Sequence, residues 1–72
     1  MNKERRKAIT KEIENIKDVV QSILDEEEDA FYNMPEGLQS SENGIVSEEA
    51  QELLSSAIDS LEDAITYLED IV

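Results

Sequence analysis

The chain has 72 residues, enough for one small domain, and its 19 acidic and 6 basic side chains give a net charge of −13. It contains neither cysteine nor histidine, which excludes thiol chemistry and the usual zinc ligands. No apolar run of about 20 residues could span a membrane, and the basic start lacks the apolar region of a signal peptide. We therefore expect a cytoplasmic protein.

The charges are divided unevenly along the chain. All 6 cations lie within residues 1–17, together with three acids, whereas residues 18–72 hold the other sixteen acids and no cation. Such an acidic body should repel duplex nucleic acid. The acids either keep the protein in solution or imitate the charge of a nucleic acid toward a basic partner.

The first predicted element is a helix over residues 2–32. Apolar side chains recur along it in steps of four and three residues, at Ile9, Ile13, Ile16, Val20 and Ile23, with Val19 and Leu24 beside them. This spacing is typical of an amphipathic helix with a heptad seam. Asn2 is the predicted N-cap, and Pro35 disfavours helical geometry at Met34.

Both ends of this predicted helix carry charge clusters. In "KERRK" (3–7), the side chains of Arg5, Arg6 and Lys7 are candidates for phosphate binding, unless they only neutralise the protein's own acids. The candidate acidic surface is "DEEED" (25–29), namely Asp25, Glu26, Glu27, Glu28 and Asp29. Cations at the start of the helix and acids near its end oppose the helix dipole. Antiparallel packing of two copies would bring the cations of one copy beside the acids of the other. The register of such packing cannot be read from the sequence.

A metal site is a further interpretation of the acids. Asp25 with Glu28, and Asp59 with Glu62, have the i, i+3 spacing by which all-α nucleotide pyrophosphohydrolases hold magnesium. In a chain with 19 acids such pairs arise easily, and no lysine stands beside them for a triphosphate. We therefore expect a solvated acidic face, with no catalytic residues, no metal site and no cofactor.

The predicted connector, residues 33–46, begins with large side chains. Phe31, Tyr32, Asn33, Met34 and Pro35 are candidates for contact with a partner or ligand. Alternatively, Phe31, Met34 and Leu38 fold back and close the end of a helical bundle. The residues that follow are polar, with a predicted turn at Asn43–Gly44, so residues 39–44 should be the mobile part.

The second predicted helix covers residues 47–72, with Ser47 as its N-cap. "AIDSLED" (57–63) is followed at once by "AITYLED" (64–70), which repeats a heptad. The repeat puts Leu54, Leu61 and Leu68 in one row and Ala50, Ala57 and Ala64 in the next. The fold class is therefore all-α, a two-helix hairpin. Because each apolar stripe is wider than one partner helix can cover, we expect a homo-oligomer, most simply a dimeric four-helix bundle.

Three stretches together resemble a known group of proteins. "ERRK", "DEEEDAFYNMPEGLQSSENG" and "AIDSLEDAITYLED" are similar to short, acidic, mostly uncharacterised proteins carried by phages and prophages of Gram-positive bacteria. The resemblance covers most of the chain, and its distinctive part is "NMPEGLQ". It implies a phage origin and a helical hairpin, and no established activity.

The sequence leaves three functions open. The first is a non-catalytic phage accessory protein that binds and blocks a host protein, in host defence or regulation, through an acidic surface that imitates nucleic acid. The second is an oligomer that sequesters a nucleotide immune signal between the basic N-termini and the aromatic connector. The third is a magnesium-dependent nucleotide hydrolase.

Overall fold

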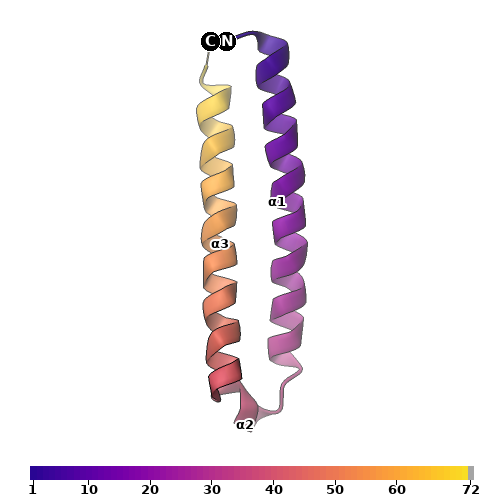
Figure 1. Ribbon diagram of the computed structural model, residues 1–72, viewed down its shortest axis with the longest axis vertical. Helices are drawn as coiled ribbons and strands as arrows, with labels where there is room; N and C mark the ends of the chain where they lie inside the picture. The colour runs from indigo at the N-terminus through magenta and orange to yellow at the C-terminus, as the bar shows by residue number, and fades with distance from the viewer. Residues whose placement is uncertain (72) are drawn as a thin grey trace.

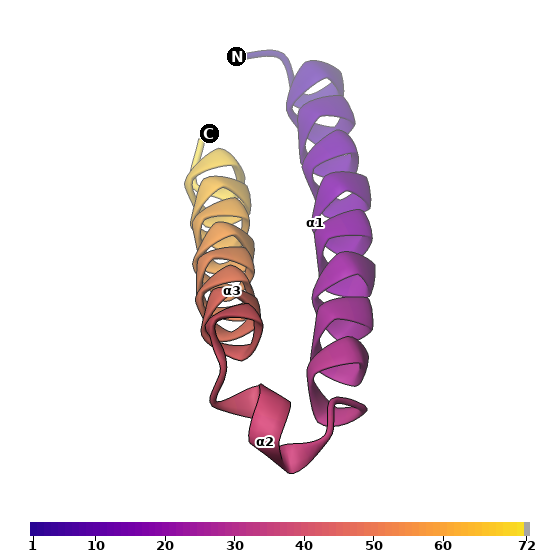
Figure 2. The ribbon, with the colours of Figure 1, turned by 60° about the horizontal axis from the view of Figure 1, so that its bottom comes forward.

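The computed structural model describes residues 1–71, which form two long antiparallel helices and a short one between them. Helix α1 spans Lys3–Tyr32, α2 spans Glu36–Gln39 and α3 spans Glu42–Glu69. Figure 1 shows α1 and α3 side by side, with both chain ends at one end of the hairpin and α2 at the other. Turning the molecule brings α2 forward as the corner between them (Figure 2). The predicted all-α hairpin is confirmed.

Helix α1 begins and ends where local chemistry predicts. The side-chain oxygen of Asn2 accepts hydrogen bonds from the backbone N–H groups of Glu4 (2.7 Å) and Arg5 (3.4 Å), which confirms the predicted N-cap. At the other end, the N–H of Asn33 donates to the carbonyl of Asp29 at 3.0 Å. Pro35 then cannot continue the helix, and it caps the next one instead.

The predicted connector over residues 33–46 is wrong, because α3 begins at Glu42 and not at Ser47. Ser41 is the N-cap: its hydroxyl oxygen accepts from the N–H of Gly44 at 3.5 Å, and its hydroxyl donates to the carbonyl of Leu38. The expected turn at Asn43–Gly44 is therefore the first turn of α3. Residues 39–44, expected to be mobile, comprise the end of α2, a two-residue link and the start of α3. The predicted end at residue 72 lies outside the described residues.

Gly44 explains how the corner closes so tightly. A Cβ atom added there would overlap the carbonyl oxygen of Gln39 and lie 2.8 Å from the Cα atom of Gln39. Only glycine lets the first turn of α3 approach the last residue of α2 in this way. The glycine of Asn43–Gly44, from which the sequence predicts a turn, is required here because two backbone segments approach closely.

The interface between α1 and α3 is a heptad seam with a thin core. The least exposed residues recur every three or four positions, at Arg6, Thr10, Ile13, Lys17, Val20, Leu24, Glu27 and Phe31 on α1, and at Gly44, Ser47, Gln51, Leu54, Ile58, Leu61, Ile65 and Leu68 on α3. Within residues 1–71, only Leu24 and Ile58 are buried large apolar side chains. Ser47, the expected cap, is 4% exposed on the side of α3 that faces α1. No helix in residues 1–71 is both long and apolar enough to cross a membrane.

Candidate functional site: an apolar face between two charged ends

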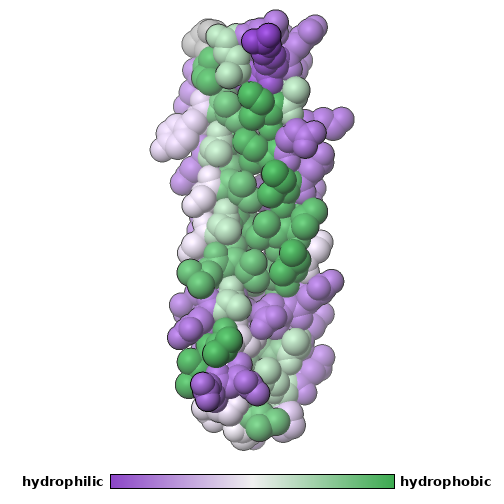
Figure 3. Space-filling model, viewed as in Figure 1, coloured by the Kyte–Doolittle hydropathy of each residue, from purple (hydrophilic) through white to green (hydrophobic). Residues whose placement is uncertain are grey.

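One broad face of the hairpin is apolar and uncovered. On α1, Ile9, Ile16, Val19 and Ile23 are between 40% and 59% exposed. On α3, Leu53 is 72% exposed, and Ala57 is also exposed. Figure 3 shows that apolar side chains of both helices merge into a continuous band along this face. Isolated surface apolar residues need no explanation, but a contiguous apolar band marks an interaction surface.

The band exists because the stripe on α1 is wider than the seam. Ile13, Val20 and Leu24 point toward α3 and use one side of the stripe. Ile16 and Ile23 lie about 100° further around the helix, at the positions just before Lys17 and Leu24. The heptad pattern predicted from the sequence is therefore divided between the seam and the open face.

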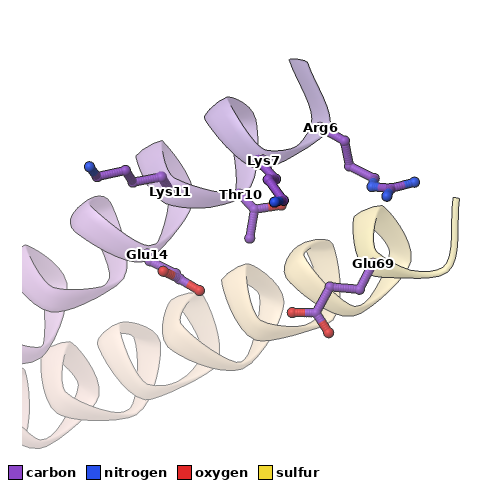
Figure 4. A pocket seen from close by; sticks show the side chains of 6 residues that line it. All are labelled: Arg6, Lys7, Thr10, Lys11, Glu14 and Glu69. Atoms are coloured by element: carbon purple, nitrogen blue, oxygen red, sulfur yellow. The ribbon is translucent and has the colours of Figure 1, made fainter. Parts of the chain in front are cut away.

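The basic end of the hairpin holds a groove of about 470 Å³ on the side away from the apolar face. It is lined by Arg6, Lys7, Thr10, Lys11 and Glu14 from α1 and by Glu69 from α3 (Figure 4). Arg6 also donates to the backbone carbonyl of Ile71, which joins the start of α1 to the end of α3. The groove mixes three cations with two carboxylates, so an anionic ligand would meet both signs of charge.

Four of the groove residues were not predicted as site residues. Thr10, Lys11 and Glu14 line it because they follow Arg6 and Lys7 on one side of α1. Glu69 joins them from the far end of the chain, so its place depends on the antiparallel pairing of the helices. A search for residues four and seven positions after the basic cluster would have found the first group.

The opposite end is acidic. Ten carboxylates gather at this end, namely Asp25, Glu26, Glu27, Glu28, Asp29, Glu36, Glu42, Glu48, Glu49 and Glu52. A second groove there is lined by Glu28, Glu48, Gln51, Glu52, Ser55 and Ser56. Among the described residues, the single salt bridge joins Lys17 to Glu62 at 3.6 Å, well away from this end. The acids at the loop end therefore have no cation of their own chain to neutralise them.

The aromatic start of the corner is held in place by Gln39. Its side-chain amide donates to the carbonyls of Phe31 and Met34, at 3.3 Å each. The rings of Phe31 and Tyr32 meet edge to face with centroids 5.6 Å apart. Phe31 and Met34 are half-buried, whereas Tyr32, Asn33 and Leu38 are exposed. Phe31 and Met34 are therefore partly covered by the corner, whereas the exposure of Leu38 contradicts the expectation that it folds back.

The structure separates the two groups of predicted ligand-binding residues. Arg5, Arg6 and Lys7 lie at the start of α1, and Phe31 to Pro35 lie at its end, in a hairpin 54 Å long. One chain cannot bring the basic cluster and the aromatic corner into one pocket. A site made of both would need a second copy.

The two acidic pairs proposed as a magnesium site do not face each other. Glu62 pairs with Lys17 of α1, and Asp25 lies eight residues further along, or about 12 Å. Within residues 1–71, no cluster of three or more acids could hold a metal ion. The i, i+3 spacing was a correct observation, but the antiparallel register places the pairs at different levels.

Comparison with known proteins adds no relative: no protein-family model, no curated protein and no solved structure matches the chain.

Proposed function

We propose that the chain is a non-catalytic binding protein that self-associates into a helical bundle and presents its acidic loop end to a basic cleft on another protein. In line with the phage resemblance, the partner would be a host defence or regulatory protein in the host cytoplasm. The observation that carries the proposal is the loop end itself, where ten carboxylates have no cation of the described chain beside them.

The charge of the loop end favours basic partners over acidic ones. Uncompensated acids at one end of a rod produce a negative field that reaches about 10 Å into solution at 0.1 M salt. Such a field repels nucleic acid and attracts the basic surfaces that normally hold it. A basic protein cleft is therefore the complementary surface.

Self-association follows from the thin core. A 72-residue chain without cysteine has no disulfide to support it, and within residues 1–71 only two large apolar side chains are buried between the helices. The apolar band of the open face holds as much of the heptad pattern as the seam does. Covering it with a second hairpin would complete a four-helix bundle.

The test is capture of a basic partner from host lysate with two matched variants. One variant neutralises Asp25, Glu26, Glu28 and Asp29 to the corresponding amides, and leaves Glu27 unchanged because it lies on the seam. The control neutralises four acids at the other end, Asp59, Asp63, Glu69 and Asp70. We expect the wild type and the control to capture the partner in 0.1 M salt and release it near 1 M. Equal capture by the loop-end variant would contradict the proposal.

A second candidate is sequestration of a nucleotide signal, which one observation favours: three cations and the hydroxyl of Thr10 line one groove. Calorimetric titration with cyclic and linear nucleotides tests it. Changing Arg6 and Lys7 to Ala should abolish any heat of binding, whereas changing Lys3 to Ala should not. If the wild type shows no heat of binding, this candidate is rejected and the first proposal is unaffected.

A further inference from the structure

We propose that two copies pair antiparallel through the apolar face, with a two-fold axis that passes beside Ile16 of α1 and Leu61 of α3. The inference rests on the proposed self-association and adds the orientation and the register of the partner copy. The arrangement pairs the basic start of each chain with the acidic loop end of the other.

The shape of the face permits two symmetric arrangements. If the loop ends of both copies lie together, each α1 covers the partner's α3, and the ten acids at each loop end face ten more. If the loop ends lie apart, each α1 covers the partner's α1, and cations of one copy lie beside acids of the other. Because like charges repel and opposite charges attract at these short separations, the second arrangement is favoured.

The exposed isoleucines of α1 fix the register. Ile9, Ile16 and Ile23 are spaced by seven residues and are all open to solvent in the single hairpin. An axis beside Ile16 sets it against the partner's Ile16 and sets Ile9 against the partner's Ile23. No other antiparallel register centred within α1 covers all three with one another.

The residues that flank the isoleucines have opposite charges at the positions that this register brings together. Arg5 precedes Ile23 by 18 residues, which are five turns of helix, so it lies on the same side as the isoleucines. Glu27 follows Ile9 by 18 residues and lies at the edge of the seam that borders this side. The same register places Arg5 against the partner's Glu27. Within residues 1–71 neither side chain forms a salt bridge, and Glu27 is half-buried at the seam without a cation. A cation of the partner copy beside this carboxylate would therefore add a favourable charge contact.

The apolar row of α3 is compatible with this axis. The ion pair between Lys17 and Glu62 puts these two residues near one level, and because the helices run in opposite directions, Ile16 and Leu61 lie within about 3 Å of a common level. Leu54 and Leu68 lie seven residues to either side of Leu61. An axis near Leu61 therefore brings Leu54 to the level of the partner's Leu68, at the edge of the seam, and it lies within about 3 Å of the axis derived from α1.

The face is large enough for a stable dimer. The broad side of the hairpin, which carries the apolar band, measures 54 by 14 Å between Cα atoms, or about 750 Å² (Figure 3). Standard protein interfaces bury about 800 Å² on each partner. Only a copy that covers the whole length of both helices reaches this area, which again requires alignment end to end.

The decisive experiment is charge reversal followed by mixing. Arg5→Glu alone places two acids together in each dimer, and Glu27→Arg alone places two cations together. We expect each variant to dimerise about tenfold more weakly than the wild type, and an equimolar mixture of the two to recover wild-type affinity as a heterodimer. The controls Lys11→Glu and Glu52→Arg make the same charge changes on the opposite side and should have less than a twofold effect. A mixture that stays as weak as its components would overturn the register.

Crosslinking tests the same register with the native charges, because the chain has no cysteine of its own. With a short bis-maleimide, Ile16→Cys should crosslink to itself. Ile9→Cys and Ile23→Cys should each fail alone and crosslink when mixed, since copies of one position lie about 21 Å apart. A dimer in sedimentation that lacks this pattern overturns the register and leaves self-association intact. A monomer in sedimentation overturns both.

Discussion

A Cβ atom at Gly44 has no room beside Gln39, whereas one at Gly37 has no atom within 4 Å. We therefore expect Gly44→Ala to destabilise the hairpin by about 1–3 kcal/mol, because the first turn of α3 must move away from α2. Gly37→Ala should be neutral or stabilising by up to about 1 kcal/mol, since alanine favours the helix in which it lies. Urea unfolding followed by circular dichroism measures both. Equal effects at the two glycines would show that the corner is looser than described.

Two serines distinguish the observed start of α3 from the predicted one. Ser41→Ala removes the hydroxyl that caps Gly44, and we expect a loss of about 1 kcal/mol in the free energy of unfolding. Ser47→Ala leaves a small side chain in the helix interior and removes only the 3.5 Å hydrogen bond from Gln51, so its cost should be smaller. A larger loss at Ser47 than at Ser41 would mean that the helix begins at the later serine.

Single residues also show what the sequence could predict. Asn2 can be predicted as a cap because the helical pattern begins directly after it. Ser47 was mistaken for a cap because it precedes three acids that suit a helix start, whereas Ser41 is followed by Asn43–Gly44, which has the composition of a turn. Gly44 is necessary because the backbones of α2 and α3 approach closely there. This approach forms only when the corner is folded, so it cannot be predicted from the local sequence.

At the scale of the helices, the heptad pattern predicts two antiparallel helices but not which residues meet. A stripe as wide as that on α1 can be placed against α3 in more than one rotation. The rotation depends on where α2 brings the chain back, and α2 was not predicted. This is why the isoleucines at positions 9, 16 and 23, which look like the core of the helix in sequence, lie on the open face.

Adjacent residues of α1 test that division. Leu24 is 6% exposed in the seam, and Ile23 is 46% exposed on the open face. We expect Leu24→Ala to lower the stability of the isolated hairpin by about 2 kcal/mol. Ile23→Ala should change the isolated hairpin by less than about 1 kcal/mol but weaken dimerisation about tenfold. Denaturant unfolding at low concentration and sedimentation of the same samples separate the two effects. Reversed effects at the two positions would place Ile23 in the seam.

At the scale of the whole molecule, charge and apolar surface are arranged together. The chain is a rod with a basic end, an acidic end and one apolar side. An antiparallel pair would neutralise part of each acidic end through Arg5 and its neighbours. The remaining carboxylates, which face away from the apolar side, would be free to meet a basic partner. The proposed self-association and the proposed partner binding would therefore use different sides of the rod.

Sedimentation equilibrium of the wild-type chain at micromolar concentration tests the central claim, that the apolar face is covered by a second copy. We expect a mass of twice 8.1 kDa, and a dimer that weakens when Ile16 is changed to Lys on the open face. A mass of 8.1 kDa that persists to about 100 μM, with unchanged helix content, would contradict it.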